Sequence, residues 1–177
     1  DTYLIDKFFQ LRGSELPAAP ASLDALRGKV AVVFGGSYGI GHDIVTQLYA
    51  AGVRVHAFAR STTGTDVGSR ESVAEALKGV AKAEGRIDYI INTAGVLNKE
   101  PLHAMEQETI EAAVRTNYMG TVNVALEAYP YLKETRGKLV FFTSSSYTRG
   151  RAFYSIYSST KAAIVNFVQA VAQEWEA

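Results

Sequence analysis

Short runs of mainly apolar residues alternate along this chain with longer stretches in which apolar residues recur at helical spacing. Such a run is typical of a strand buried on both faces of a parallel sheet. Apolar positions three and four residues apart instead predict a helix with one buried face. The predicted strands cover residues 30–34, 53–59, 87–91 and 139–142, and the predicted helices cover 42–51, 72–84, 109–132 and 157–175. This alternation predicts an α/β fold built on a doubly wound parallel sheet.

The connection after the second predicted strand is too short to hold a helix and another strand. Only five residues separate Arg60 from Asp66. Ser69 or Ser72 is the expected N-terminal cap of the next helix.

The first predicted strand ends in a glycine-rich turn with the spacing Gly35-x3-Gly39-x-Gly41. Glycines in such a turn let a pyrophosphate approach bare backbone, and the helix that follows offers free N–H groups and a positive dipole end. No Gly-Lys-Ser/Thr follows, so a P-loop NTPase is disfavoured. The turn predicts a Rossmann-like dinucleotide site, with a plain cluster of turn glycines as the alternative.

The end of the second predicted strand is where such folds select their cofactor. An acidic side chain there would bind the adenosine ribose of NAD. This chain has Arg60 and Ser61 instead, and a guanidinium beside hydroxyl groups suits the 2′-phosphate of NADP. The sequence favours NADP(H) over NAD(H), with an ordinary exposed arginine as the alternative.

Residues 1–28 fall outside the strand and helix pattern. Residues 3–11 are amphipathic with near-helical spacing, residues 16–20 read as a stiff linker, and Leu23 and Leu26 are expected to pack a last turn against the domain. We interpret residues 1–28 as an arm or linker, either a joint to an upstream domain or a plain N-terminal arm. Residues 29–177 form the predicted dinucleotide-binding and catalytic domain.

Length, charge and cysteine content limit the number of domains and the kinds of molecule that this protein is expected to bind. A length of 177 residues suits one domain. The formal net charge of zero argues against nucleic acid or an anionic membrane as the main partner. Without cysteine there are no disulfides or thiolate metal sites, which is compatible with a reducing compartment, and we expect a cytoplasmic protein with no metal site. No apolar run approaches the length of a membrane span.

Tyr157 and Lys161 have the residue types and spacing for acid–base chemistry on a helix. A phenol with an unperturbed pKa of about 10 is a poor base until a positive neighbour stabilises phenolate. Residues four apart share one helix face, so the lysine can supply that charge. The Tyr-x3-Lys pattern also occurs at Tyr3/Lys7 and Tyr129/Lys133. Only Tyr157/Lys161 follows a serine-bearing strand end, with Ser144 thirteen residues upstream.

Four features in this order resemble the short-chain dehydrogenase/reductase family. They are the glycine turn, Asn92-Thr93-Ala94-Gly95, Asn117, and Ser144 with Tyr157-x3-Lys161. The resemblance implies hydride transfer between a nicotinamide cofactor and a carbonyl or alcohol. In it, Tyr157 is the acid/base, Lys161 tunes it, Ser144 (or, second choice, Ser145) orients the carbonyl and Asn117 serves a proton relay.

The resemblance also implies the residues that bind the cofactor. These are Gly35, Ser37, Tyr38, Gly39, Ile40, Gly41, Arg60, Ser61, Asp66, Val67, Asn92, Ala94, Gly95, Tyr157 and Lys161. The family forms dimers or tetramers through its two long helices, so the resemblance implies a homo-oligomer.

The chain departs from the family pattern at three points. Phe34 replaces a usual threonine and Thr93 a usual asparagine, which puts the polar bridge between the strand ends in doubt. The short link between Arg60 and Asp66 is the second departure, and against the family pattern it implies that one helix is lost and that the edge strand of the sheet is reduced or missing. The third is that the sequence stops directly after the catalytic helix, so we expect the C-terminal part of the reductase domain to be missing.

A narrower resemblance concerns the substrate. The phrases TYLIDKFFQLR, ARSTTGTDV and SSSYTRGR resemble the reductase half of bifunctional cytidylyltransferase/reductase enzymes that form CDP-ribitol. This implies reduction of ribulose 5-phosphate to ribitol 5-phosphate, with Arg149 and Arg151 binding the substrate phosphate and Ser145 near the substrate. The alternative is that the two arginines are ordinary surface charges on a loop. The alternatives are a catalytically silent NADP-binding module and an extended-family epimerase or dehydratase, whose Gly-x2-Gly-x2-Gly spacing is absent here.

Overall fold

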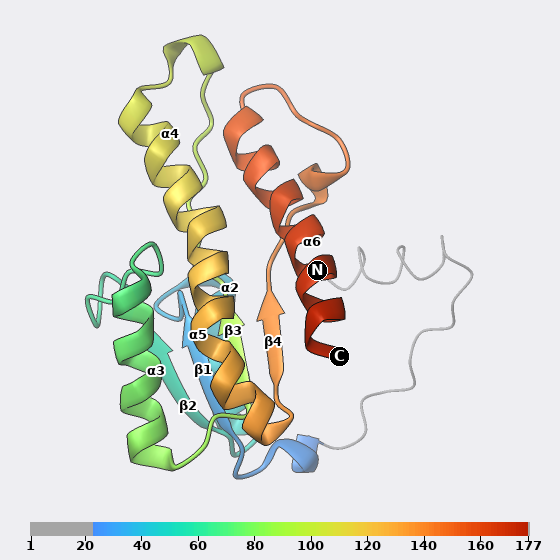
Figure 1. The fold of residues 1–177 in the computed structure, drawn as a ribbon. Coiled ribbons are helices and arrows are strands. Elements are labelled where there is room, and N and C mark those ends of the chain that lie inside the picture. Colours follow the sequence, from blue (N-terminus) through green and yellow to red (C-terminus); the bar gives the residue numbers. More distant parts are fainter. Residues whose placement is uncertain (1–22, 177) are drawn as a thin grey trace.

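Four parallel strands form the centre of the protein. In a computed structural model, which describes residues 23–176 apart from the side chain of Glu176, the strand order is β2-β1-β3-β4 (Figure 1). The strands are β1 (Val30–Phe34), β2 (Arg54–Phe58), β3 (Tyr89–Asn92) and β4 (Lys138–Phe141). All three pairings are parallel, which confirms the predicted sheet.

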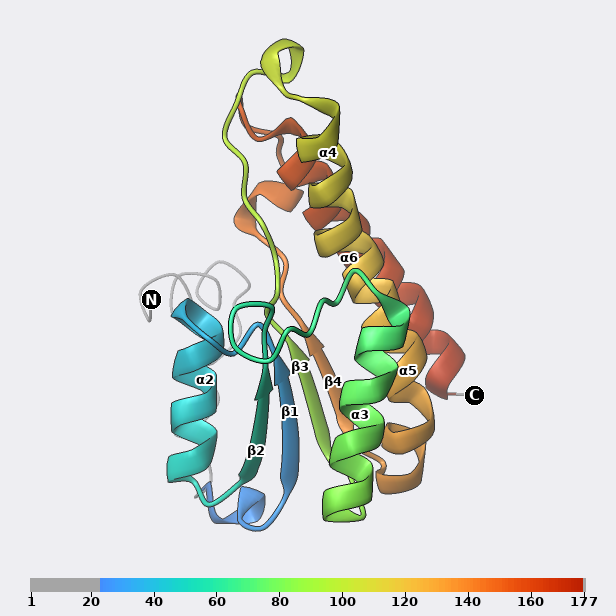
Figure 2. The ribbon, with the colours of Figure 1, turned by 90° about the vertical axis from the view of Figure 1, so that its left-hand side faces the viewer.

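Helices cover both faces of this sheet. Figure 2 shows α2 on one face and α3, α5 and α6 on the other. Their bounds are α2 Gly39–Ala50, α3 Arg70–Glu84, α4 Gln107–Val114, α5 Gly120–Thr135 and α6 Ser155–Glu176. The short turns are η1 Leu23–Leu26, η2 Leu102–Ala104 and η4 Ser145–Tyr147. The prediction of a doubly wound α/β domain is therefore confirmed.

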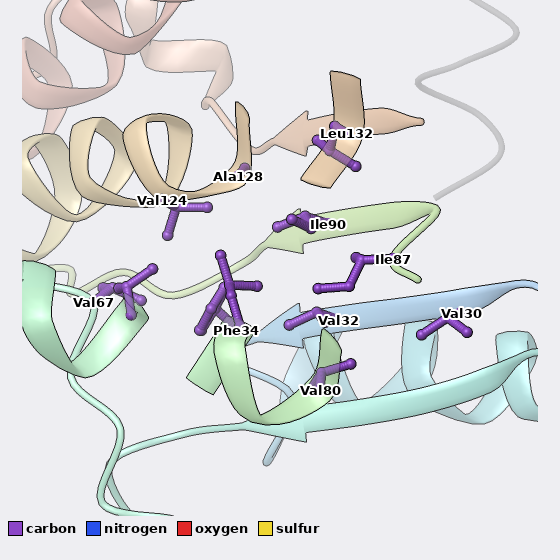
Figure 3. Close-up of a cluster of buried hydrophobic side chains, with 12 residues drawn as sticks. Val30, Val32, Phe34, Val67, Val80, Ile87, Ile90, Val124, Ala128 and Leu132 are labelled. Carbon is purple, nitrogen blue, oxygen red and sulfur yellow. The ribbon is translucent and has the colours of Figure 1, made fainter. Parts of the chain in front are cut away.

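The main core lies between the sheet and the helices α3 and α5 (Figure 3). Successive residues of a strand point to opposite faces, so Val30, Val32 and Phe34 of β1 face these helices. Phe34 is 1% exposed and its ring centroid lies 5.8 Å from that of Phe58. The aromatic residue that departs from the family pattern is therefore a core residue.

The shortened link after β2 has the expected consequence. Among the described residues no strand lies outside β2, and no helix separates β2 from α3. Ser69 caps α3, since its hydroxyl accepts a hydrogen bond from the Ser72 amide at 3.3 Å. Of the two predicted caps, Ser69 is the correct one.

The long predicted helix over residues 109–132 is interrupted by one wide turn. The π-helical turn η3 (Arg115–Met119) joins α4 to α5 and carries Asn117 at its centre. Such turns occur mostly as single insertions within α-helices and are frequent at functional sites. This local irregularity brings Asn117, 1% exposed, to the interior.

The predicted N-terminal arm is only partly within the described residues. The amphipathic stretch and the linker, residues 3–20, lie outside them. The turn η1 is present, but it buries no residue and Leu23 is 54% exposed. The prediction that Leu23 packs against the domain is wrong, because most of its side chain is open to solvent, whereas Leu26 is half-buried.

Asp88 joins the starts of two strands at the end of the sheet away from the glycine turn. Its carboxylate accepts hydrogen bonds from the Val30 amide at 2.9 Å and the Arg86 guanidinium, and Lys29 Nζ lies 3.6 Å away. Burial raises the pKa of Asp88, but Arg86, Val30 and Lys29 together outweigh burial and hold that pKa below its usual value of 3.8. The native structure therefore favours the ionised carboxylate.

Replacing Asp88 by Asn should lower the free energy of unfolding by about 2 kcal/mol at pH 7, because a buried amide and a guanidinium lose an ionised acceptor. A lowered folded pKa contributes stability above pH 3.8, and this is lost as the pH falls through the folded value. The deficit should therefore shrink below pH 3.8 in urea unfolding experiments.

The exposed Asp43 of α2 offers the matched control, Asp43→Asn, which should change stability by less than about 0.5 kcal/mol. An Asp88→Asn protein as stable as the wild type at pH 7 would contradict this account of Asp88.

Candidate active site

A groove runs across the carboxyl ends of β1, β2 and β3. Its two halves share Gly35, Tyr38, Ala94 and Gly95. One half is also lined by Ser37, Phe58, Ala59, Arg60, Ser61, Thr65, Asp66, Val67 and Thr116. The other half is lined by Gly39, Ile40, Gly41, Thr93, Val96, Leu97, Phe142, Thr143, Tyr157 and Lys161. In doubly wound sheets, ligands bind at this edge.

The structure thus gathers fourteen of the fifteen predicted cofactor-binding residues along one groove. Asn92 is the exception. It is buried, and its side-chain oxygen accepts a hydrogen bond from the Ala94 amide at 3.1 Å. Its part is to shape the turn after β3, while Ala94 and Gly95 line the groove.

The glycine turn depends on the absence of side chains. Gly35 has φ +81°, and a Cβ there would lie 2.6 Å from the Ala94 amide nitrogen. A Cβ on Gly41 would overlap the carbonyl oxygen of Gly35. Tyr38, at the N-cap of α2, makes no capping bond through its side chain. The first amides of α2 are thus available to an anion, as a pyrophosphate site requires.

The polar bridge between the ends of β1 and β3 exists, although the usual residues are absent. The amide and the hydroxyl of Thr93 both donate to the Phe34 carbonyl, each at 2.9 Å. The bridge therefore uses the backbone of Phe34 where the family pattern uses a side chain. The doubt raised by Phe34 and Thr93 is removed.

Arg60 and Ser61 lie at the outer end of the groove. The Ser61 hydroxyl donates to Ser37 Oγ at 3.2 Å, which links the β2 end to the glycine turn. Arg60 is exposed and no hydrogen bond or ion pair joins its side chain to another described residue. Arg60, Ser61 and Ser37 line the same half of the groove, so the exposed guanidinium and the two hydroxyl groups are available to bind an anion there.

Asp66 and Val67 are fixed against α5. The Asn123 side chain donates to the Val67 carbonyl at 2.9 Å, and Gly120 leaves room for the Val67 side chain. The Asp66 carboxylate accepts from the Gly68 amide at 2.8 Å. These contacts place the pair on the groove wall in place of the missing helix and strand.

Tyr157 and Lys161 lie on one face of α6, at the inner end of the groove. Lys161 Nζ is 5.9 Å from the centroid of the Tyr157 ring and donates to the Phe142 carbonyl at 2.8 Å. The Thr143 hydroxyl in turn donates to the Lys161 carbonyl at 2.8 Å. These bonds tie the end of β4 to α6. Burial lowers the pKa of the Lys161 ammonium from its usual value of 10.5.

Asn117 connects three elements behind this pair. Its side-chain oxygen accepts from the Val96 amide at 2.8 Å, and its nitrogen donates to the Val96 carbonyl at 2.9 Å and to Thr160 Oγ1 at 3.2 Å. A Cβ on Gly95 would lie 3.2 Å from the Asn117 oxygen and 3.6 Å from Lys161 Nζ. The buried amide thus has the partners that its position in the sequence requires.

The three serines after β4 have different surroundings. Ser144 is half-buried, Ser145 is exposed and Ser146 is 4% exposed. Arg151 donates to Ser145 Oγ at 3.2 Å, whereas Arg149 is exposed and has no hydrogen-bond or ion-pair partner among the described residues. The groove lining does not include Ser144, Ser145, Arg149 or Arg151. These residues lie in the chain segment that follows Thr143, a residue of the inner half of the groove.

Sequence reasoning missed Thr143, Thr160 and Ser146, whose hydroxyls contact Lys161, Asn117 and Ser144. For Thr143 and Thr160 the available signal was their position next to a predicted catalytic residue. In the described residues no cluster of His, Asp and Glu side chains is arranged to hold a metal ion. Within residues 23–176 no helix is long and apolar enough to cross a membrane.

Comparison with known proteins identifies the family. The family model described as short chain dehydrogenase matches residues 61–177. The chain belongs to this family, whose members are NAD(P)-dependent oxidoreductases.

Two relatives illustrate the range of similarity. The chain is 45% identical to the bifunctional ribulose 5-phosphate reductase/CDP-ribitol pyrophosphorylase of Haemophilus influenzae, over 99% of this chain and 37% of that protein. It is 31% identical to the acetoacetyl-CoA reductase of Shinella zoogloeoides, over 82% of this chain and 67% of that protein. The chain thus spans little more than a third of the bifunctional relative.

Solved structures show the same fold. The aldohexose dehydrogenase of Thermoplasma acidophilum matches with a TM-score of 0.81 at 23% identity, over 85% of this chain and 63% of that one. At this identity the likeness establishes the Rossmann-like fold alone.

A buried ammonium should make stability depend on pH. Because the folded pKa of Lys161 is lowered, the unfolded chain holds the proton between that value and 10.5. The wild type should therefore gain stability relative to Lys161→Met as the pH rises from 7 to 10, by at most about 1.4 kcal/mol per pH unit. Urea unfolding of both proteins measures the difference.

Lys133→Met is the matched control, since Lys133 is exposed and also follows a tyrosine by four residues. Its stability difference from the wild type should stay flat over the same pH range. A flat difference for Lys161→Met as well would show that burial does not lower the pKa of Lys161.

Proposed function

We propose that this chain carries the reductase activity of an NADP-dependent enzyme that converts ribulose 5-phosphate to ribitol 5-phosphate. The observation that carries the proposal is the Tyr157–Lys161 pair at the inner end of a groove built on bare glycine backbone. The similarity to the bifunctional enzyme of Haemophilus influenzae, which extends over 99% of this chain, supports the substrate.

The groove fits a dinucleotide. Gly35 and Gly41 leave a cradle that a Cβ would fill, and the uncapped N-terminus of α2 provides amides for a pyrophosphate. Arg60 and Ser61 would hold the 2′-phosphate, since the guanidinium carries no competing carboxylate among the described residues. When bound, NADPH supplies the hydride that reduces the carbonyl carbon.

The protein side chains handle the proton and the developing charge. The Tyr157 hydroxyl protonates the substrate oxygen, and the Lys161 ammonium 5.9 Å from the ring stabilises the phenolate that remains. Ser144 donates a hydrogen bond to the same oxygen and holds the carbonyl in line. In the reverse direction the phenolate acts as the base.

Asn117 serves the proton relay through its backbone. Its side chain is used by Val96 and Thr160, so it is not free to bind water. The Asn117 carbonyl, which accepts from the Thr121 hydroxyl at 2.8 Å, is the acceptor that would hold a relay water beside Lys161.

Arg149 and Arg151 would bind the substrate phosphate. Both follow the catalytic serine on the segment that leads into α6, and Arg151 already reaches Ser145 Oγ at 3.2 Å. A planar guanidinium binds phosphate through two hydrogen bonds. These two arginines would distinguish a phosphorylated ketose from a neutral one.

We also propose a homo-oligomer, because the family forms dimers or tetramers through its two long helices. The helix formed by α4, η3 and α5 exposes the apolar side chains of Val114, Met119 and Leu126. A dimer or tetramer that pairs this helix with α6 across a two-fold axis would cover them. The cytoplasmic location stays a prediction.

Replacing Tyr157 by Phe should reduce the rate of NADPH oxidation with ribulose 5-phosphate by at least about 100-fold, because the proton donor is lost. The dissociation constant of NADPH, measured by fluorescence titration, should change less than about twofold, because the ring remains.

Tyr129→Phe is the control, since it removes the same hydroxyl from the same Tyr-x3-Lys spacing outside the groove. Its turnover should match the wild type. A Tyr157→Phe enzyme that keeps a tenth of the wild-type rate contradicts the catalytic assignment.

Assays of the wild type test the rest of the proposal. NADPH binding without turnover of any ketose or ketose phosphate would favour the catalytically silent module. Equal turnover of ribulose and ribulose 5-phosphate would contradict the phosphate site.

Replacing Arg60 by Ala should weaken NADPH binding about tenfold or more and leave NADH binding nearly unchanged, because only the 2′-phosphate loses a charged partner. Arg70→Ala is the control, since Arg70 pairs with Glu127 away from the groove. An Arg60→Ala protein with unaltered NADPH affinity would exclude this residue from cofactor selection.

A further inference from the structure

Ser146 is the most buried of the three serines and contacts the proposed catalytic serine directly. Its amide donates to Ser144 Oγ at 3.2 Å, and its hydroxyl donates to the same oxygen at 3.0 Å. Ser145 does not take part, because its hydroxyl faces Arg151. Among the described residues, Ser144 is the only hydrogen-bond partner of the Ser146 hydroxyl.

These two bonds leave the Ser144 hydroxyl only one direction in which it can donate its proton in a hydrogen bond. A serine hydroxyl has two acceptor lone pairs and one proton. Both lone pairs of Ser144 Oγ are occupied by donors from Ser146. The remaining tetrahedral direction belongs to the proton of Ser144, which therefore points away from Ser146. No described residue accepts that proton in a hydrogen bond.

The turn that carries Ser146 is well anchored. Ser144 occupies the N-cap of η4, and its carbonyl accepts from the Tyr147 amide at 3.0 Å. η4 packs against α6, the helix of Tyr157 and Lys161. A buried hydroxyl held on this turn is a fixed donor, whereas water at the same place would be free to rotate.

We propose that Ser146 is a positioning residue that aims the hydroxyl proton of Ser144 at the substrate oxygen. The proposal rests on the role of Ser144 proposed above. Accepting two hydrogen bonds also polarises the Ser144 hydroxyl and makes it a better donor. Without the Ser146 hydroxyl, only the amide of residue 146 would hold Ser144 Oγ, the Ser144 proton could rotate away from the substrate oxygen, and part of its stabilisation of the transition state would be lost.

The test is a double-mutant cycle on turnover with the whole protein, using Ser144→Ala, Ser146→Ala and the double variant. Ser144→Ala should lose about 100-fold in kcat, as loss of one transition-state donor does. Ser146→Ala should lose about fivefold in kcat, the equivalent of one ordinary hydrogen bond, with KM and NADPH affinity unchanged. In the double variant the second change should add nothing, because Ser146 acts only through Ser144.

Ser159→Ala is the matched control, since within residues 23–176 the Ser159 hydroxyl bonds only the Ser155 carbonyl of its own helix, at 2.8 Å. It should leave kcat unchanged. Urea unfolding of the same variants should give a coupling between Ser144 and Ser146, which reports their bond independently of activity.

The outcomes separate the two proposals. Full activity of Ser144→Ala would remove the proposed role of Ser144, and the inference about Ser146 with it. A normal loss in Ser144→Ala, combined with full activity of Ser146→Ala or with losses that multiply in the double variant, would overturn the role of Ser146 alone.

Discussion

The contact between the ends of β1 and β3 determines where everything else in the site can lie. Gly35 and Ala94 approach so closely that a Cβ on Gly35 would stand 2.6 Å from the Ala94 amide nitrogen, and Thr93 holds the distance with two bonds to the Phe34 carbonyl. Only glycine permits this approach at φ +81°. The groove exists because the backbone at this point carries no side chains, so the glycines matter for the space that they leave open more than for flexibility.

Local sequence spacing explains the geometry of the Tyr–Lys pair but not its proposed activity. Tyr129 and Lys133 have the same spacing in α5, and Lys133 Nζ lies 5.5 Å from the Tyr129 ring centroid, close to the 5.9 Å between Lys161 and Tyr157. The difference between the pairs is their surroundings. Lys161 is 7% exposed and bonded to the Phe142 carbonyl, whereas Lys133 is exposed. In a buried site the ammonium acts on the phenol through a medium of low dielectric, where its charge has a larger effect.

The sequence predicted the sheet and most of the groove, because unbroken apolar runs and glycines act locally. Its failures concern contacts between distant residues. The bridge from Thr93 to Phe34 uses a backbone carbonyl, which no side-chain pattern reveals. Leu23 is exposed, and its apolar type alone could not predict this, because burial depends on whether the folded domain has a surface against which the side chain can pack. Ser146 could not be distinguished from Ser144 and Ser145 by type, and the three differ only in their burial and in their hydrogen-bond partners.

The link after β2 is short and holds no helix, and α5 supports the outer end of the groove there. Val67 belongs to the main core together with Phe34 and Val124, and Asp66 precedes it in the loop that follows the edge strand β2. Asn123 holds the Val67 carbonyl, and Gly120 provides the hollow into which the Val67 side chain fits. Both residues follow the π-helical turn, and the same turn carries Asn117 towards Val96 and Thr160. One irregular helix therefore supports both ends of the groove, and a change of its phase at η3 would displace the Asp66–Val67 wall and the neighbourhood of Lys161 together.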